Sequence, residues 1–340
     1  MRACSGWDWK TPSSSGSLRS ARRFCRSAGS TRSGFWLCTG NHARCHLHVT
    51  NGERSRGRIQ NGFEALHREQ EAAQIARNRE SYRRDLARNR AGEQRLAEAI
   101  RNSILLYLQT SPVRSNAGVL LGGRVWRATK LDDGRVFTRN EQDDMGDLSV
   151  DILLDASTSQ KDGQETVSNQ GYLIASALTR CGVPCRVMSF CSMTGYTILR
   201  IFRDYGRPQD NEKIFEYVSN GCNRDGLAIR VAHRLIMDAP CEHRMLIVLS
   251  DVKPNDIVPI STAGEEERVL YEKDAGVRDT AFEVRRARAD GVSVICVFTG
   301  DDEDLPAARL VYGRELARIQ SVDRLADTVG RLIRDQIRNL

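Results

Sequence analysis

The sequence predicts an α/β protein with a doubly wound, mostly parallel sheet and one antiparallel edge strand, preceded by a helical and hairpin region. Two observations support this. Short apolar, β-branched runs recur from residue 148 onward, as strands buried on both faces require, at 148–154, 185–190, 196–202, 244–250 and 292–298. Helical segments separate most of these runs and close the chain, at 165–179, 226–236, 278–289 and 324–339.

The run at 196–202 departs from this alternation. It follows its predecessor after a tight Met193-Thr194-Gly195 break, which favours an antiparallel edge strand. Upstream, residues 62–110 carry a helical apolar stripe, which indicates an antiparallel helix pair or one long helix with a break near Gly92. Two β-rich runs then flank Asp133-Gly134, which is typical of a hairpin turn.

Composition and sequence pattern divide the 340 residues into three regions. Residues 1–34 are rich in Ser, Arg and Gly and lack apolar periodicity, so we expect a disordered basic tail. Residues 35–147 hold a Cys/His segment, the helical pair and the hairpin, and residues 148–340 form the α/β domain. Basic side chains exceed acidic ones by nine in residues 1–60, whereas residues 116–340 carry five more acidic than basic side chains. The positive net charge of +7 therefore comes from the N-terminal region. Nucleic-acid binding by residues 116–340 is disfavoured.

Several classes of protein are excluded or disfavoured by motif. The chain has no stretch of eighteen apolar residues, which excludes a helical membrane span. It has neither the G-x-x-x-x-G-K-[ST] phosphate loop nor the G-x-S-x-G elbow of serine hydrolases. Ten cysteines without a secretion signal indicate a reducing compartment, and we expect a cytoplasmic protein.

A Cys/His cluster lies close to the basic tail. Within WLCTGNHARCHLHVT, the side chains that could ligate Zn²⁺ are Cys38, His42, Cys45, His46 and His48. The spacing is not that of a paired C-x₂-C finger, and the alternation at 46–49 also fits a strand. A zinc site and a structural turn and strand both remain open.

Oxygen ligands gather at the predicted carboxyl ends of the strands, where α/β sheets bind ligands. The first strand of the domain ends in Asp155-x-Ser157-x-Ser159, and the run MLIVLSD ends in Asp251. Asn223 and Asp225 precede a helix. Carboxylates and hydroxyls suit a hard cation such as Mg²⁺. Asp225, Ser157 and Ser159 could instead cap helices, whereas Asp155 and Asp251 at neighbouring strand ends would repel each other without a cation or a proton.

These residues resemble a von Willebrand factor A (VWA) domain, whose metal-ion-dependent adhesion site (MIDAS) combines Asp-x-Ser-x-Ser with a Thr and a further Asp. The resemblance implies that Asp155, Ser157, Ser159 and Asp251 are metal ligands. Asn223 and Asp225 stand near the usual Thr position. The segments Asn223-x-Asp225-Gly226 and LSDVKPND are similar to the A domains of NorD-type nitric oxide reductase activation proteins and of the cobaltochelatase subunit CobT.

The resemblance implies a non-catalytic interaction subunit that works with a MoxR-type AAA+ ATPase to activate or metallate a metalloenzyme client such as nitric oxide reductase. Arg224 and Lys253 flank the expected site and could assist an acidic partner. The alternative is a Mg²⁺-dependent enzyme component, a chelatase or phosphoryl hydrolase, that uses the same carboxylates.

Overall fold

A seven-stranded sheet forms the centre of the protein, which is described by a computed structural model at residues 38–52, 62–107, 112–115, 119–120, 122–131, 136–140, 148–260, 269–319 and 322–338. The strands lie in the order β1-β7-β6-β5-β8-β11-β12. Their bounds are β1 (His46–Thr50), β5 (Leu148–Asp155), β6 (Cys185–Met193), β7 (Tyr196–Arg203), β8 (His243–Ser250), β11 (Val292–Phe298) and β12 (Leu316–Arg318). Only the β6–β7 pair is antiparallel among the pairs of this sheet. The predicted mostly parallel α/β fold is confirmed.

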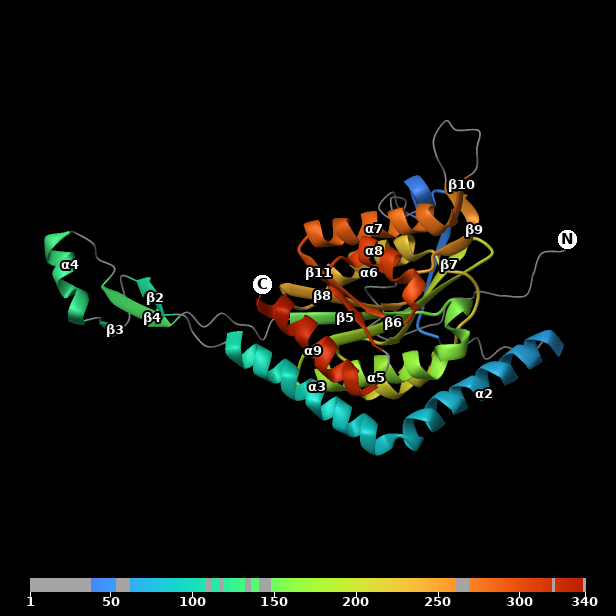
Figure 1. Ribbon diagram of the computed structural model, residues 1–340, viewed down its shortest axis with the longest axis horizontal. Helices are drawn as coiled ribbons and strands as arrows, with labels where there is room; N and C mark the ends of the chain where they lie inside the picture. The colour runs from blue at the N-terminus through green and yellow to red at the C-terminus, as the bar shows by residue number, and fades with distance from the viewer. Residues whose placement is uncertain are drawn as a thin grey trace.

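Helices cover both faces of the sheet (Figure 1). One layer contains α6 (Asp225–Ile236), α7 (Lys273–Ala289) and α8 (Leu305–Tyr312); the other contains α2 (Gly62–Arg84), α3 (Leu86–Tyr107), α5 (Gln164–Arg180) and α9 (Val322–Arg338). Strands β5 and β8 are almost entirely buried between these layers. On the α9 side, Leu96 and Ile100 of α3 join Val329 and Ile333 in one apolar cluster. The helix pair upstream of residue 148 therefore packs on the same core as the α/β domain.

The sheet also includes a strand that sequence reasoning left open. Residues 46–50 form β1, which pairs in parallel with the outer side of β7. Strand β7 is antiparallel to β6, as predicted, but it lies one position in from the edge. The expectation of an edge strand was wrong because β1 comes from more than a hundred residues upstream. The expected tail at 1–34 lies outside the described residues.

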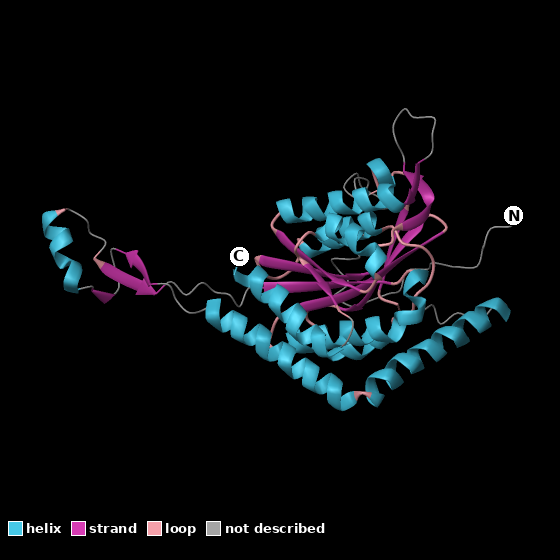
Figure 2. Cartoon of the chain, in the orientation of Figure 1, coloured by secondary structure: helices cyan, strands magenta, loops and turns pink. Residues whose placement is uncertain are grey.

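Two local expectations upstream of the domain need correction. Helices α2 and α3 meet at Asp85, where Figure 2 shows a sharp bend, and not near Gly92, which lies buried inside α3. The Asn89 side chain donates to the Tyr82 carbonyl (3.0 Å) and so partners a backbone oxygen at this bend.

The predicted hairpin was also only partly right. Residues 125–130 form a short helix, α4 (Val125–Lys130), instead of a strand, and Asp133-Gly134 lies outside the described residues. The short apolar run there fits a helix as well as a strand, so its periodicity could not decide. A three-stranded sheet remains, made of β2 (Pro112–Ser115), β3 (Val119–Leu120) and β4 (Phe137–Asn140).

Smaller elements surround the carboxyl ends of the main strands. They are the 3-10 turns η2 (Gly40–His42), η4 (Thr158–Gly163), η5 (Pro208–Glu216) and η6 (Asp302–Asp304), and the hairpin of β9 (Asn255–Ile260) and β10 (Val269–Glu272). Among the described helices, none combines the length and the apolarity needed to cross a bilayer.

Candidate metal centre

Three acidic residues meet at one end of the sheet. Asp155 is the last residue of β5 and Asp251 follows β8 directly, and these two strands pair in parallel. Asp225 begins α6 beside them. All three are buried, with 0%, 4% and 3% of their surface exposed, and we refer to them as the carboxylate cluster. Parallel neighbours end at the same edge of a sheet, which explains why sequence-distant acids come together here.

Asp155 lies at the centre of the cluster. One oxygen, Oδ1, accepts a hydrogen bond from the Ser157 amide (2.9 Å), and the other, Oδ2, accepts one from the Ser250 hydroxyl (2.8 Å). Burial raises the pKa of Asp155 to about 7, and the nearby charge of Asp251 adds to that rise. These hydrogen bonds favour the charged form but do not outweigh the loss of water.

The two serines of the D-x-S-x-S motif turn toward each other. Their hydroxyl oxygens lie 2.9 Å apart, with Ser157 buried and Ser159 exposed. Ser159 also hydrogen-bonds to Asp251, which partly offsets the rise in the pKa of that carboxyl caused by burial. Ser157 precedes η4 but makes no capping hydrogen bond through its side chain, so capping does not account for this serine.

Asp225 has a buried oxygen without a partner. Its Oδ1 makes no hydrogen bond in the described structure, although the carboxyl group does hydrogen-bond to the Asn223 side chain. Burial, followed by the charges of Asp155 and Asp251, raises the pKa of Asp225 well above its usual range. An unpartnered buried carboxylate oxygen is costly, which points to a ligand that completes it.

Asn223 occupies a different role in the same loop. Its amide nitrogen lies 3.5 Å from Oδ2 of Asp155, and its amide oxygen accepts a hydrogen bond from the Asn255 backbone (3.0 Å). The side-chain oxygen that could bind a cation is therefore already engaged with β9. Asn223 holds the loop against β9, while Asp225 keeps a free oxygen.

No basic side chain forms an ion pair with the carboxylate cluster among the described residues, although the charge of Lys253 offsets part of the rise that burial causes in the pKa of Asp251. Lys253 turns away to Asp304 (2.9 Å) and Asp301 (3.7 Å), at the start of η6 and α8. Within the described residues no three His, Cys, Asp or Glu side chains are arranged to hold a metal by themselves. The donor set thus mixes carboxylate and hydroxyl oxygens, which suits a hard divalent cation.

Arg224 does not face the candidate site. It is fully buried, where it donates to His42 Nδ1 (2.9 Å) and to Asp256 (2.8 Å) and stacks on the ring of Tyr271 at 4.2 Å. Asp279 completes this group, which we call the arginine hub, by accepting from Tyr271 (2.8 Å) and lying 3.3 Å from His42 Nε2. Arg224 was predicted to assist a partner, but burial removes it from any partner's reach.

The five Cys and His side chains near the N-terminus do not gather at one point. His42 belongs to the arginine hub, and Cys45 is buried in the core beneath α6. His46 is exposed against the ring of Tyr196 (4.9 Å), while Cys38 and His48 are partly buried. Residues 46–50 form strand β1, the alternative left open by the sequence. Among the described residues the predicted zinc site has no common centre.

Sequence reasoning missed three contributors to the candidate site. Ser250 supplies a hydroxyl to Asp155, and Tyr217 donates a hydrogen bond to the Asp155 backbone carbonyl. His67 of α2 reaches the rim, where its Nε2 lies 3.2 Å from Asn220, a residue whose amide bonds the Ala156 carbonyl (2.7 Å). Only Ser250 carried a usable signal, since it directly precedes Asp251 at a strand end.

Val252 shows that the loop after β8 is strained. Its φ of +57° lies in the left-handed region, where a β-branched side chain is disfavoured. Its backbone amide donates to Ser250 Oγ (2.9 Å), so the bend ties the loop to the hydroxyl that also bonds Asp155. Strain of this kind is concentrated at functional sites.

Comparisons with known proteins place these observations in context. No protein-family model matches the chain. The uncharacterized protein YojO of Bacillus subtilis is 23% identical over 269 residues, which are 75% of this chain and 40% of YojO. NorD of Brucella suis is 26% identical over 178 residues, which are 49% of this chain and 26% of NorD. The chain therefore spans less than half the length of these curated relatives.

Solved structures of similar fold include two VWA domains. The vWF domain of the pilus tip protein Mfa5 from Porphyromonas gingivalis aligns with a TM-score of 0.44 at 10% identity, covering 56% of this chain and 96% of that one. The VWA domain of SpRpn10 aligns with a TM-score of 0.35 at 12% identity, covering 53% and 94%. The sequence comparison thus shows a partial similarity to NorD, as the sequence predicted.

Proposed function

We propose that this chain is a metal-dependent interaction subunit, which captures an acidic side chain of a partner protein through a divalent cation. The observation that carries this proposal is the carboxylate cluster. Three acidic side chains lie buried together without an ion pair among the described residues, and one of their oxygens is unpartnered. Buried charges of one sign are unfavourable unless protons or a cation compensate them.

The residues that would hold the cation are Asp155, Asp251, Ser157, Ser159 and Asp225. Asp225 is preferred to Asn223 because its Oδ1 is free, whereas the Asn223 oxygen bonds to Asn255. Mg²⁺ is the expected ion, since all donors are hard oxygens. When bound, it would supply a Lewis-acid position for a carboxylate of the partner. Asp155 and Ser250 hold the loops in place around it.

The similarity to NorD supports a particular class of partner. NorD-type proteins are expected to act with a MoxR-type AAA+ ATPase on a metalloenzyme client, and we extend both to this chain. A cytoplasmic location, expected from the cysteines, agrees with an ATPase partner. The eight described cysteines are all free thiols, which is compatible with that compartment.

Affinity capture of the ATPase by the tagged full chain tests this proposal. We expect capture in Mg²⁺ and its loss in chelator, because the partner carboxylate then lacks its acceptor. Asp155→Ala should abolish capture in Mg²⁺, whereas Asp162→Ala, an exposed acid in the adjacent turn, should leave it unchanged. Equal capture by wild type with and without chelator contradicts the proposal.

The same preparation distinguishes the interaction subunit from a Mg²⁺-dependent enzyme. His42 is held in the arginine hub and His67 contacts Asn220, so neither imidazole contacts the carboxylate cluster. The isolated chain should therefore release no phosphate from model esters and insert no metal. Turnover that disappears in Asp155→Ala would favour the Mg²⁺-dependent enzyme instead.

A further inference from the structure

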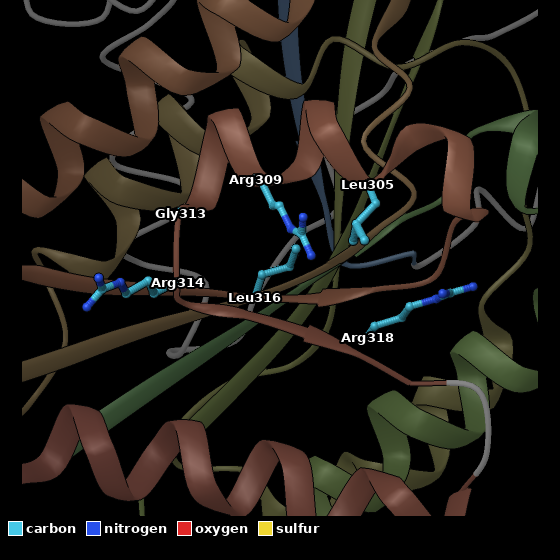
Figure 3. Close-up of a pocket in the computed structure, with 6 residues that line it drawn as sticks. All are labelled: Leu305, Arg309, Gly313, Arg314, Leu316 and Arg318. Carbon is cyan, nitrogen blue, oxygen red and sulfur yellow. The ribbon is translucent and has the colours of Figure 1, made fainter.

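A hollow of about 600 Å³ lies between helix α8 and strand β12, and none of the six residues that line it belongs to the carboxylate cluster. Figure 3 shows the side chains that line it, which are Leu305, Arg309, Gly313, Arg314, Leu316 and Arg318. Three of these six are arginines and two are leucines. Such a lining combines positive charge with apolar surface in one place.

The arginines of the hollow lack ion pairs or hydrogen-bond acceptors within the described protein. Arg309 and Arg314 are exposed and form no ion pair within the described part of the chain. Arg318 pairs through one terminal nitrogen with Asp302, but its Nε is buried and has no acceptor. A buried N–H without an acceptor is unfavourable, which favours an anionic ligand that completes it.

The arrangement of the charges indicates the shape of the ligand. In Figure 3, Arg309 points into the space above Leu316, whereas Arg314 and Arg318 lie toward opposite ends of β12. Positive charge is thus spread along the strand and does not converge on one point. An extended ligand fits this spread better than a single phosphate group.

Strand β12 adds a second feature suited to an extended chain. It is the last strand of the main sheet, and no described strand pairs with its outer side. An unpaired strand edge can accept a peptide in extended conformation. Leu305 and Leu316 are half-buried beside it and offer apolar contacts for alternate side chains.

We infer that the hollow between α8 and β12 binds an extended segment of a partner protein in which acidic and apolar side chains alternate. A nucleic acid is disfavoured because two of the six lining residues are leucines and none is an aromatic residue on which a base could stack. The site needs no metal, so it stands independently of the proposed function. It also lies close to the carboxylate cluster, because Lys253 pairs with Asp304, the residue before Leu305.

Fluorescence anisotropy on the full chain tests this inference. The probe is a labelled peptide of alternating Glu and Leu, and the comparison peptide alternates Gln and Leu. We expect the Glu peptide to bind, with an affinity that falls roughly tenfold in R309Q/R314Q, as for the loss of charge-assisted hydrogen bonds. The Gln peptide should bind the wild type no more tightly than the Glu peptide binds R309Q/R314Q. R278Q/R285Q, which alters two exposed arginines of α7, is the matched control and should bind like the wild type.

Any one of the following results would overturn the inference. Absence of Glu-peptide binding by the wild type removes the site, and unchanged binding in R309Q/R314Q places the peptide elsewhere. Loss of binding in chelator or in Asp155→Ala assigns the peptide to the metal centre, which supports the proposed function while contradicting a separate site. Tighter binding of labelled single-stranded DNA than of the Glu peptide reassigns the hollow to nucleic acid.

Discussion

The carboxylate cluster and the arginine hub are two buried polar groups near the same end of the sheet, and they differ in charge balance. In the hub, Arg224 is neutralised by Asp256 and completed by His42 and Tyr271. In the cluster, three acids lie together, and none of them forms an ion pair with a described basic side chain. The two groups meet at consecutive residues, since Arg224 directly precedes Asp225 in the chain.

This difference separates structure from function. Arg224 finds its ion pair and hydrogen bonds within the protein, although Oδ1 of Asp256 and Nε2 of His42 lack hydrogen-bond partners among the described residues. The hub can therefore stabilise the fold without an outside ligand for its arginine. The unbalanced carboxylate cluster needs a partner from outside. The hub ties η2, α6, α7 and the β9–β10 hairpin together, and so positions the loop that carries Asn223 and Asp225.

The largest effect should come from breaking the balance of the hub. Arg224→Leu leaves Asp256 buried without its positive partner, and we expect a loss of about 3–5 kcal/mol in the free energy of unfolding. Denaturant titration in chelator measures this loss. The hub would not be a structural network if the variant lost less than about 1 kcal/mol.

Removing a charge from the carboxylate cluster should not lower the free energy of unfolding as the loss of Arg224 does. Asp155→Asn reduces the repulsion with Asp251, so in chelator the free energy of unfolding should change little or rise. The stabilisation by Mg²⁺ should disappear; for the wild type it amounts to about 2.7 kcal/mol at a hundredfold excess over Kd. Thermal unfolding with and without Mg²⁺ checks both points. A Mg²⁺ effect that survives in the variant would refute the ligand assignment.

The two regions should also respond to pH in opposite directions. The pKa of Asp155 is raised from 3.8 to about 7, so its contribution to stability is present below about pH 4 and lost as pH rises through 7. Burial lowers the pKa of His42 from 6.5 to about 2, so its contribution is present above 6.5 and lost as pH falls.

Variants separate these two contributions. In chelator, Asp155→Asn should lessen the loss of stability between about pH 4 and pH 7, by at most about 4 kcal/mol. His42→Gln should lessen the loss below pH 6.5. Unfolding curves across this range, compared with the wild type, give both differences. Identical pH profiles for the wild type and Asp155→Asn would show that the acid is not perturbed in the folded protein.

The smallest effect is expected at Lys253, beside Asp251 of the carboxylate cluster. Lys253 is 41% exposed and pairs with Asp304, so Lys253→Ala should change the free energy of unfolding by less than about 1 kcal/mol. Partner capture should weaken only at low salt, because exposed charges are screened. Capture at low and high ionic strength measures this. A loss as complete as that of Asp155→Ala would make Lys253 a primary contact instead.

Much of the fold was predictable because periodicity is a local property. The strands at 148–155, 185–193, 243–250 and 292–298 are buried on both faces and appear in the sequence as continuous apolar runs. Strand β1 was not assigned because its pairing with β7 joins segments about 150 residues apart. No local pattern encodes such a pairing.

The candidate site was predictable in its members but not in their roles. Asp155 and Asp251 stand at strand ends, which the sequence shows directly. Arg224 was misjudged because its burial depends on His42, a residue from another part of the chain. The preference for Asp225 over Asn223 needed the β9 contact, which only the tertiary structure reveals.

Direct measurement of ion binding tests the central claim most simply. Mn²⁺, a paramagnetic substitute for Mg²⁺, is titrated into the full chain and the free ion is followed by electron paramagnetic resonance. We predict one Mn²⁺ bound per chain by the wild type and by Asp162→Ala, competed by Mg²⁺, and none bound by Asp155→Ala at this site. A wild-type chain that binds no Mn²⁺ up to concentrations on the order of 1 mM contradicts the account.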